Sequence, residues 1–303
     1  MPRLPVGPVR GAVVFLLMVL NTLFIGVPLI VLALARLALP LSAWRRWSGG
    51  VLIRMAEGWV AVNSRMLALT QRIQWEVSGL EGLSPDGWYL VIANHRSWVD
   101  ILAMQATLNR RVPFLKFFIK DQLRWVPVLG LAWWALDMPF MKRYSKEQLA
   151  RRPELRGTDL EATRRACAKF RDHPTSVMNF VEGTRFTPAK RASTRSPYQH
   201  LLKPRAGGIA FVMEALGPIL TEMLDVTLAY PAGGGGFWNL ACGRIPRIVI
   251  DVRRRTLPTR NAAGDYASDD GFRGRFQEWL AGIWREKDAR LEALLGAESD
   301  TRR

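Results

Sequence analysis

Cysteine and histidine are scarce in this chain, and their scarcity limits the kinds of site it can build. The two cysteines, Cys167 and Cys242, form no Cys-x-x-Cys pair, so we predict no disulfide framework and expect a reducing compartment. Of the three histidines, His173 and His200 have no neighbouring ligand set. We predict that both lie at the surface and that the protein uses no metal ion and no cofactor.

Several common motifs are also missing. The sequence contains no Gly-x-Ser-x-Gly elbow, no phosphate-binding Gly-x4-Gly-Lys loop and no dinucleotide fingerprint. A nucleophile elbow, a P-loop and a Rossmann-type cofactor site are therefore not expected.

Acidic residues are outnumbered by basic ones. With 26 Asp and Glu against 43 Lys and Arg, the formal charge is +17, which predicts an anionic partner such as phospholipid headgroups, a phosphorylated substrate, an acidic carrier protein or nucleic acid. Twelve tryptophans favour the membrane, because indole rings settle at the headgroup level and basic side chains are drawn to anionic lipid. We expect the membrane lipid bilayer, and no nucleic acid, among the partners.

The N-terminal region carries a long apolar run. Residues 12–35 include no charged side chain and exceed the roughly 20 residues that span a bilayer. No cleavage site follows promptly, so a signal peptide is not expected. Pro28 and a second apolar stretch at 37–41 leave two arrangements open, a spanning helix and a hairpin in one leaflet. Because more arginines follow the run than precede it, we predict that the body faces the cytoplasm from the cell inner membrane.

Beyond residue 71 the pattern changes to alternating strands and helices. We predict strands at 74–78, 88–93, 176–181, 225–230 and 247–252, and helices at 160–170 and 208–215. A last helix, in which apolar residues recur at helical spacing over 272–291, is predicted to pack on the domain. This order indicates an α/β fold with a mixed, largely parallel sheet covered by helices. We place residues 1–70 in a membrane-anchoring helical region and 71–303 in one domain, and assign no role to the glycine loop 233–236.

Two of these strands end in residues suited to chemistry. His95 and Asp100 follow the strand at 88–93, at the carboxyl end where α/β sheets place ligands. An imidazole held by a carboxylate can accept a proton from an alcohol. A loop that turns into a helix at Ser97 would return Asp100 to the ring.

The strand at 176–181 leads into Glu182, Gly183, Thr184 and Arg185. Arg185 can grip a phosphate in a bidentate fashion, and backbone amides near the glycine can approach an anion. Glu182 cannot bind phosphate, so we expect it to hydrogen-bond a substrate hydroxyl or to orient Arg185. By itself such a tetrapeptide would be a solvated turn.

Together these motifs resemble the His-x4-Asp and Glu-Gly-Thr-Arg signatures of the glycerolipid acyltransferases related to bacterial 1-acyl-sn-glycerol-3-phosphate acyltransferase. Lys116, Lys120 and the run at 125–130 are similar to the second motif of that family, 140–143 to the following strand, and 226–231 to the fourth motif. The resemblance extends from about residue 71 to residue 250. The Trp- and Arg-rich form of the chain looks most like the family branch that contains YihG.

The resemblance implies transfer of a fatty acyl group from acyl-CoA or acyl-carrier protein to the free hydroxyl of a lysophospholipid, above all 1-acyl-glycerol-3-phosphate. His95 would be the general base and Asp100 its orienting partner, with no covalent acyl-enzyme. Arg185, helped by Lys116 or Lys120, would hold the acceptor phosphate. Arg143 would be a further phosphate contact, with a snorkelling surface residue as the alternative. Pro231 would shape the acyl-donor side, unless it is an ordinary strand-ending proline.

Three alternatives stay open. The acceptor could be another lysophospholipid such as lysophosphatidylglycerol, because all of them present a phosphate. The protein could be a thioesterase or lipid hydrolase with Ser97 as nucleophile and His95 as base. It could also be a non-enzymatic basic membrane or nucleic-acid binder in which the motifs are accidental. Neither of the last two explains two strand-end motifs in family order.

Overall fold

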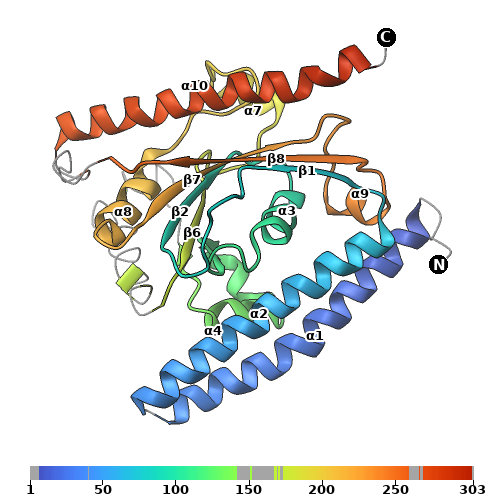
Figure 1. Ribbon diagram of the computed structural model, residues 1–303, viewed down its shortest axis with the longest axis vertical. Helices are drawn as coiled ribbons and strands as arrows, with labels where there is room; N and C mark the ends of the chain where they lie inside the picture. Colours follow the sequence, from blue (N-terminus) through green and yellow to red (C-terminus); the bar gives the residue numbers. More distant parts are fainter. Residues whose placement is uncertain are drawn as a thin grey trace.

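A six-stranded sheet lies between two layers of helices in the computed structural model (Figure 1). The structure describes residues 7–39, 41–141, 151, 167–168, 170, 173–258, 266 and 269–301. Within these residues the strands in chain order are β1 (Gln74–Ser78), β2 (Tyr89–Ala93), β3 (Leu115–Phe117), β6 (Ser176–Phe180), β7 (Glu222–Ala229) and β8 (Arg247–Arg255). Two short strands, β4 (Ile119–Lys120) and β5 (Phe140–Met141), pair separately.

The sheet order is β1-β8-β7-β2-β6-β3, and only the β7–β8 pair is antiparallel. The predicted mixed, largely parallel sheet is therefore confirmed. Strands β7, β2, β6 and β3 run in one direction, so the carboxyl ends of β7, β2 and β6 lie next to one another. The predicted strands at 225–230 and 247–252 are longer in the structure, because Glu222 pairs with Arg254 and Asp225 with Arg255 across the two strands.

Alternate residues of β2 supply the two cores of the molecule. Val91 and Ala93 belong to the core shared with the N-terminal helices, whereas Leu90 and Ile92 belong to the core shared with the C-terminal helix. All five residues of the strand are buried, as expected for a parallel strand covered on both faces.

The N-terminal helices form an antiparallel hairpin on the first face of the sheet. These are α1 (Pro8–Ala38) and α2 (Ser42–Thr70), followed on this face by α3 (Val99–Leu108), the 3-10 helix η1 (Asp121–Trp125) and α4 (Leu129–Ala135). Asn21 of α1 donates to Asn63 of α2 at 2.8 Å, and Trp59 donates to Thr22 at 3.1 Å. A buried polar pair of this kind sets the register between the two helices. By length and composition, α1 could also cross a membrane.

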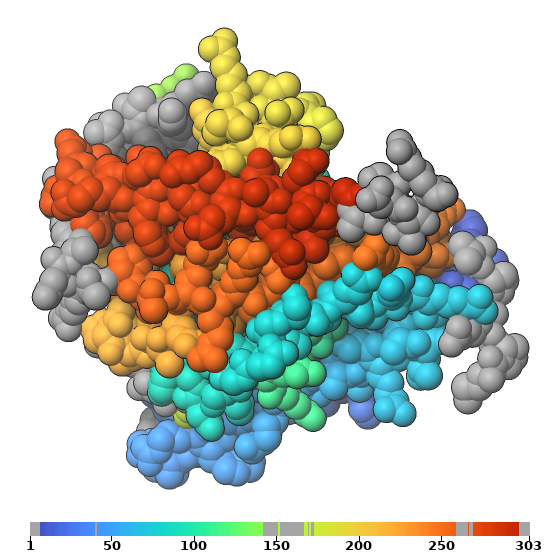
Figure 2. Space-filling view, turned by 45° about the horizontal axis from the view of Figure 1, so that its top comes forward, coloured from blue at the N-terminus to red at the C-terminus, as the bar shows by residue number. Residues whose placement is uncertain are grey.

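The opposite face is covered by the C-terminal half of the chain. It carries α7 (Pro188–Ser193), α8 (Ala206–Leu216) and the long helix α10 (Asp270–Thr301), while α9 (Phe237–Ala241) lies beside α1. Helix α10 forms a continuous ridge along the sheet (Figure 2). Asp269 accepts the amide of Phe272 and begins this helix. The predictions of a helix at 208–215 and of a packed C-terminal helix are confirmed, whereas the predicted helix at 160–170 falls largely outside the described residues.

Candidate active site

Three neighbouring strands deliver one polar residue each to the same edge of the sheet. His95 follows β2, Glu182 follows β6 and Tyr230 follows β7. Because these strands are parallel neighbours, their carboxyl ends converge, which is where ligands bind in open α/β sheets.

The predicted pair of His95 and Asp100 is formed. Asp100 lies in the first turn of α3, and its Oδ2 is 2.8 Å from Nδ1 of His95. The imidazole stacks on the ring of Phe180 with centroids 4.0 Å apart, so its plane is fixed. Among the described residues, Nε2 has no hydrogen-bond partner, and His95 lines a large cavity. A carboxylate on Nδ1 favours the tautomer in which Nε2 is an acceptor.

Asp100 is held by more than the histidine. It is fully buried, and its Oδ2 accepts the backbone amides of Arg96 at 2.6 Å and Ser97 at 2.8 Å. The hydroxyl of Tyr230 donates to Oδ1 at 2.5 Å. Burial and the adjacent carboxylate raise the pKa of Tyr230 well above its usual value, so the phenol stays protonated and donates. Sequence reasoning missed Tyr230, although its position at the end of a buried strand was a usable signal.

Glu182 occupies a different place from the one predicted. It is 1% exposed, and its two carboxylate oxygens accept the backbone amides of His95 at 3.0 Å and Leu202 at 3.1 Å. Burial raises the pKa of Glu182 to about 7, against the lowering effect of these amides and of Arg96. The expectation that Glu182 orients Arg185 or meets a substrate hydroxyl is wrong, because both oxygens hold the backbone of the site.

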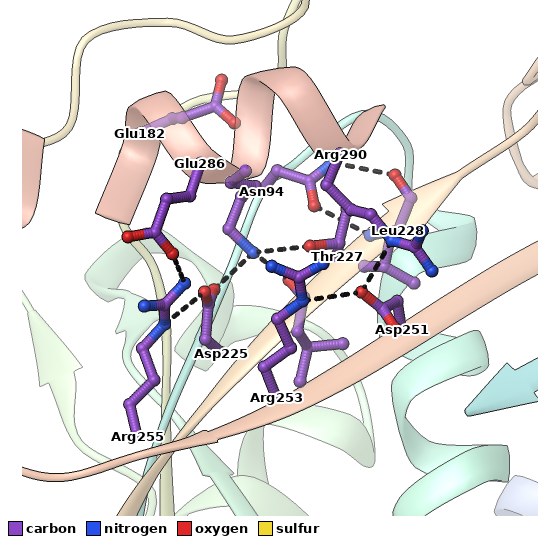
Figure 3. Close-up of polar contacts among 12 residues, drawn as sticks. Asn94, Glu182, Asp225, Thr227, Leu228, Asp251, Arg253, Arg255, Glu286 and Arg290 are labelled. Atoms are coloured by element: carbon purple, nitrogen blue, oxygen red, sulfur yellow. Dashed lines mark hydrogen bonds and ion pairs between the residues drawn. The ribbon is translucent and has the colours of Figure 1, made fainter. Parts of the chain in front are cut away.

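Two further contacts tie the His95 loop to β7 and to the glycine loop. The Asn94 side chain donates to the carbonyl of Leu228 and accepts its amide, both at 2.9 Å (Figure 3). The Ser97 hydroxyl donates to the carbonyl of Gly235 and accepts the amide of Val99, which begins α3. The loop 233–236, to which no role was assigned, therefore braces the site.

A cavity of about 1120 Å³ opens beside His95. Its walls are mainly apolar and come from the hairpin, α3, α4 and the strand ends. Gly26 and Leu29 of α1 and Ala56 and Trp59 of α2 close one side. A volume of this size with apolar walls suits a long hydrocarbon chain.

Basic and glycine residues of the second motif line the same cavity. Arg185 is exposed, and its guanidinium lies 5.4 Å from the ring centroid of Trp98. Gly183 has a φ of 68°, a conformation that glycine adopts without strain. Thr184 lines the cavity too and accepts from Lys190 at 2.7 Å. Arg205, which sequence reasoning missed, also lines the cavity.

Of the two lysines predicted to contact the phosphate, Lys120 faces the cavity and Lys116 faces away from it. Lys120 lines the cavity. Lys116 is 7% exposed and its ammonium packs 4.5 Å from the ring centroid of Phe170, on the far face of β3, so its prediction as a phosphate contact is wrong. Its neighbours Leu115 and Phe117 take the cavity-side face instead. Side chains alternate along a strand, which separates them.

Pro231 follows Tyr230 and does not line the cavity. Arg143 lies outside the described residues. His173 and His200 are both partly exposed, in agreement with the surface position predicted for them, and Nε2 of His200 lies 2.5 Å from Glu292.

A family model described as Acyltransferase matches residues 74–229, which include both motifs and all three convergent strands. This chain belongs to the acyltransferase family. The predicted family is thereby confirmed, and the YihG branch stays a prediction.

Relatives and one solved structure agree with this assignment. Lysocardiolipin acyltransferase 1 from Danio rerio is 26% identical over 93% of this chain and 71% of its own length. The 1-acyl-sn-glycerol-3-phosphate acyltransferase gamma from Mus musculus is 27% identical over 67% of this chain, which spans only 52% of that protein. The acyltransferase PlsC from Thermotoga maritima shares the fold, with a TM-score of 0.52 and 16% identity over 94% of this chain and 99% of that chain.

Proposed function

We propose that this acyltransferase moves a fatty acyl group from acyl-CoA or acyl-carrier protein to the free hydroxyl of a lysophospholipid, with His95 as general base. One observation carries the proposal: Nδ1 of His95 is bound by buried Asp100 while the ring lines the apolar cavity. An acceptor hydroxyl at Nε2 would then lie beside a space that can hold an acyl chain.

The reaction balances without a covalent enzyme intermediate. Nε2 of His95 takes the proton of the acceptor hydroxyl as its oxygen attacks the thioester carbonyl. Asp100 stabilises the resulting imidazolium through Nδ1. When the tetrahedral intermediate collapses, the thiolate leaves and receives that proton. The products are an ester and a free thiol.

The acceptor phosphate would lie against the basic rim of the cavity. Arg185 and Lys120 line it together with Gly183, and a guanidinium can bind phosphate in a bidentate fashion. We favour 1-acyl-glycerol-3-phosphate as acceptor. Lysophosphatidylglycerol and lysocardiolipin are the alternatives, the latter because relatives of that name match most of the chain.

The test is acyl transfer from labelled oleoyl-CoA, or oleoyl-carrier protein, to each of these three acceptors. Membranes would contain equal amounts of the wild type, His95→Ala or the matched control His200→Ala. We expect transfer by the wild type and the control and its loss in His95→Ala. Equal transfer by His95→Ala would overturn the role of the base, and no wild-type transfer to any acceptor would overturn the function.

The hydrolase alternative is less well supported. The Ser97 hydroxyl donates to the carbonyl of Gly235 and, among the described residues, makes no hydrogen bond to His95 that would activate it. Labelled thioester without any acceptor separates the two functions. A hydrolase would release free fatty acid at full rate without any acceptor. For an acyltransferase we expect no free fatty acid, and release of the thiol only in proportion to added lysolipid.

We also propose that residues 1–70 form a hairpin that lies in one leaflet at the cytoplasmic face of the inner membrane, with 71–303 as the catalytic domain. Helix α1 exposes a row of large apolar side chains, including Phe15, Leu20 and Phe24. Its other face is buried from Val14 to Ala33, in contact with α2 along the hairpin and with α4 and α9 of the body. A spanning α1 would have to leave that contact.

Cysteine labelling distinguishes the two arrangements. Val9 lies at the start of α1 and Arg46 in the first turns of α2, beyond the other end of α1. Both are exposed, whereas native Cys167 and Cys242 are buried. With Val9→Cys and Arg46→Cys in intact spheroplasts, a membrane-impermeant maleimide should label neither until the cells are opened. Labelling of just one of them in intact spheroplasts would indicate a spanning helix.

A further inference from the structure

Helix α10 carries two fully buried side chains with polar atoms on the face that packs against the sheet. These are Trp284 and Lys287, both at most 1% exposed and one helical turn apart. The ammonium of Lys287 lies 5.5 Å from the ring centroid of Trp284. We refer to these two residues as the α10 clamp. An ammonium is costly to bury unless each of its protons finds an acceptor.

Lys287 finds three acceptors on consecutive residues of β7. Its Nζ lies 2.6 Å from the Asp225 carboxylate and donates to the carbonyl of Val226 at 2.6 Å and to the Thr227 hydroxyl at 3.2 Å. Asp225 is in turn bound by Arg255 at 2.8 Å, and Arg255 by Glu286 of α10 at 2.7 Å (Figure 3). The four charges sum to zero, with Lys287 and Asp225 buried at one end of the cluster and Glu286 exposed at the other.

A short chain of hydrogen bonds connects each residue of the α10 clamp to the His95 loop. The residue after Thr227 is Leu228, whose amide and carbonyl are both bound by Asn94, the neighbour of His95. Trp284 donates to the carbonyl of Leu202 at 3.1 Å. The amide of Leu202 is bound by the same Glu182 carboxylate that accepts the amide of His95.

We propose that Trp284 and Lys287 of α10 are positioning residues that hold the His95 loop from behind the sheet, through Leu202 and Glu182 on one side and through β7 and Asn94 on the other. Neither residue lines the cavity, so neither touches a substrate. The proposal rests on the proposed function of His95, because the position of this loop then sets the rate of proton transfer.

Lys287 also acts on Glu182 electrostatically. Burial lowers the pKa of Lys287, and the charges of Asp225 and, more weakly, of Glu182 oppose this lowering. By reciprocity the ammonium weakly favours the ionised Glu182 carboxylate. Other charged or titratable groups around Glu182 are Arg96, Asp100 and His95, all on the β2–α3 segment. Removing the ammonium should therefore raise the pKa of Glu182 and weaken its hold on the His95 amide near neutral pH.

Two variants and two controls test the clamp. Lys287→Met removes the charge at nearly constant length, and Trp284→Phe removes the indole donor. Arg285→Met removes a cation from the same helix that pairs with exposed Glu278. Trp279→Phe makes the matched aromatic change at a partly buried position. All four are checked for folding by circular dichroism in detergent.

The first readout does not depend on activity. Hydrogen exchange of peptides that cover residues 91–98 should be at least several-fold faster in Lys287→Met and Trp284→Phe than in the wild type and the controls. If Lys287→Met fails to fold, Trp284→Phe carries the test. If a folded clamp variant exchanges residues 91–98 at the wild-type rate, the positioning role of Trp284 and Lys287 is overturned. This readout needs no acyl transfer, so it stays decisive even if the proposed function fails.

The second readout is kinetic. In Lys287→Met, kcat should fall about 10-fold or more, with both KM values within about twofold, because the loop and not the binding surface is disturbed. The acidic limb of its pH profile should move to higher pH, and this movement should disappear in the Glu182→Gln background. A loss of rate that is the same at every pH would point to a merely structural lysine and would overturn the proposal.

Discussion

Replacing Glu182 by Gln gives a sharp test of the site, because the buried carboxylate makes the stability of the protein depend on pH. Burial raises the pKa of Glu182 from the ordinary 4.5 to about 7. A carboxyl whose pKa is raised by folding binds its proton more tightly in the folded than in the unfolded chain. Stability is therefore lost as the pH rises from about 4.5 through about 7.

The size of this effect follows from the two pKa values. Their difference corresponds to roughly 3 kcal/mol of unfolding free energy, present in full below the unfolded pKa and absent above about pH 8. Gln cannot ionise, so Glu182→Gln should lack this component. We therefore compare the free energy of unfolding of the wild type with that of Glu182→Gln at each pH. The wild-type value minus the variant value should fall by roughly 3 kcal/mol between about pH 4 and about pH 8.

The assay is denaturant unfolding in detergent micelles, followed by tryptophan fluorescence across this pH range. Glu278→Gln is the matched control, because Glu278 is exposed and should change the pH dependence little. If the wild type and Glu182→Gln give parallel curves of free energy against pH, then Glu182 does not titrate near neutrality and the account of its burial is refuted.

Three further outcomes are expected. Asp100→Asn should lower kcat by about 10³- to 10⁴-fold in a folded protein, because an amide that donates to Nδ1 of His95 selects the wrong tautomer. The measurement is steady-state kinetics with a check of folding. A loss of kcat under tenfold would contradict this role. Arg185→Ala should raise the acceptor KM much more than the donor KM, and equal changes would remove its assignment to the phosphate. Gly183→Ala should destabilise the protein by about 1 kcal/mol or more, because φ at this position is 68° and the added Cβ would lie 3.1 Å from Cδ of Arg205. An unchanged melting temperature would contradict this expectation.

Much of the fold could be predicted because the central strands are apolar runs bounded by turn residues. The strand β2 is the clearest case, with five buried residues followed by Asn94 and His95. The ends of β7 and β8 were missed because they carry Glu222 and three successive arginines, which look like a loop in the sequence. Arg254 and Arg255 pair with Glu222 and Asp225 across the two strands, and Arg253 pairs with Asp251 of its own strand, so the strand can continue.

The sequence by itself determined the family, the α/β order and the pairing of His95 with Asp100, because these depend on local runs and on a spacing of five residues. Only the tertiary structure decided that Lys120 and not Lys116 lines the cavity. Strict alternation would place these two residues, four apart, on the same face of one strand. Instead β3 ends at Phe117, and Lys120 belongs to β4 in a separate two-stranded sheet. The tertiary structure also decided the partners of Glu182 and Tyr230. Those hydrogen bonds join segments that are distant in sequence, and they form only when parallel strands bring their ends to one edge.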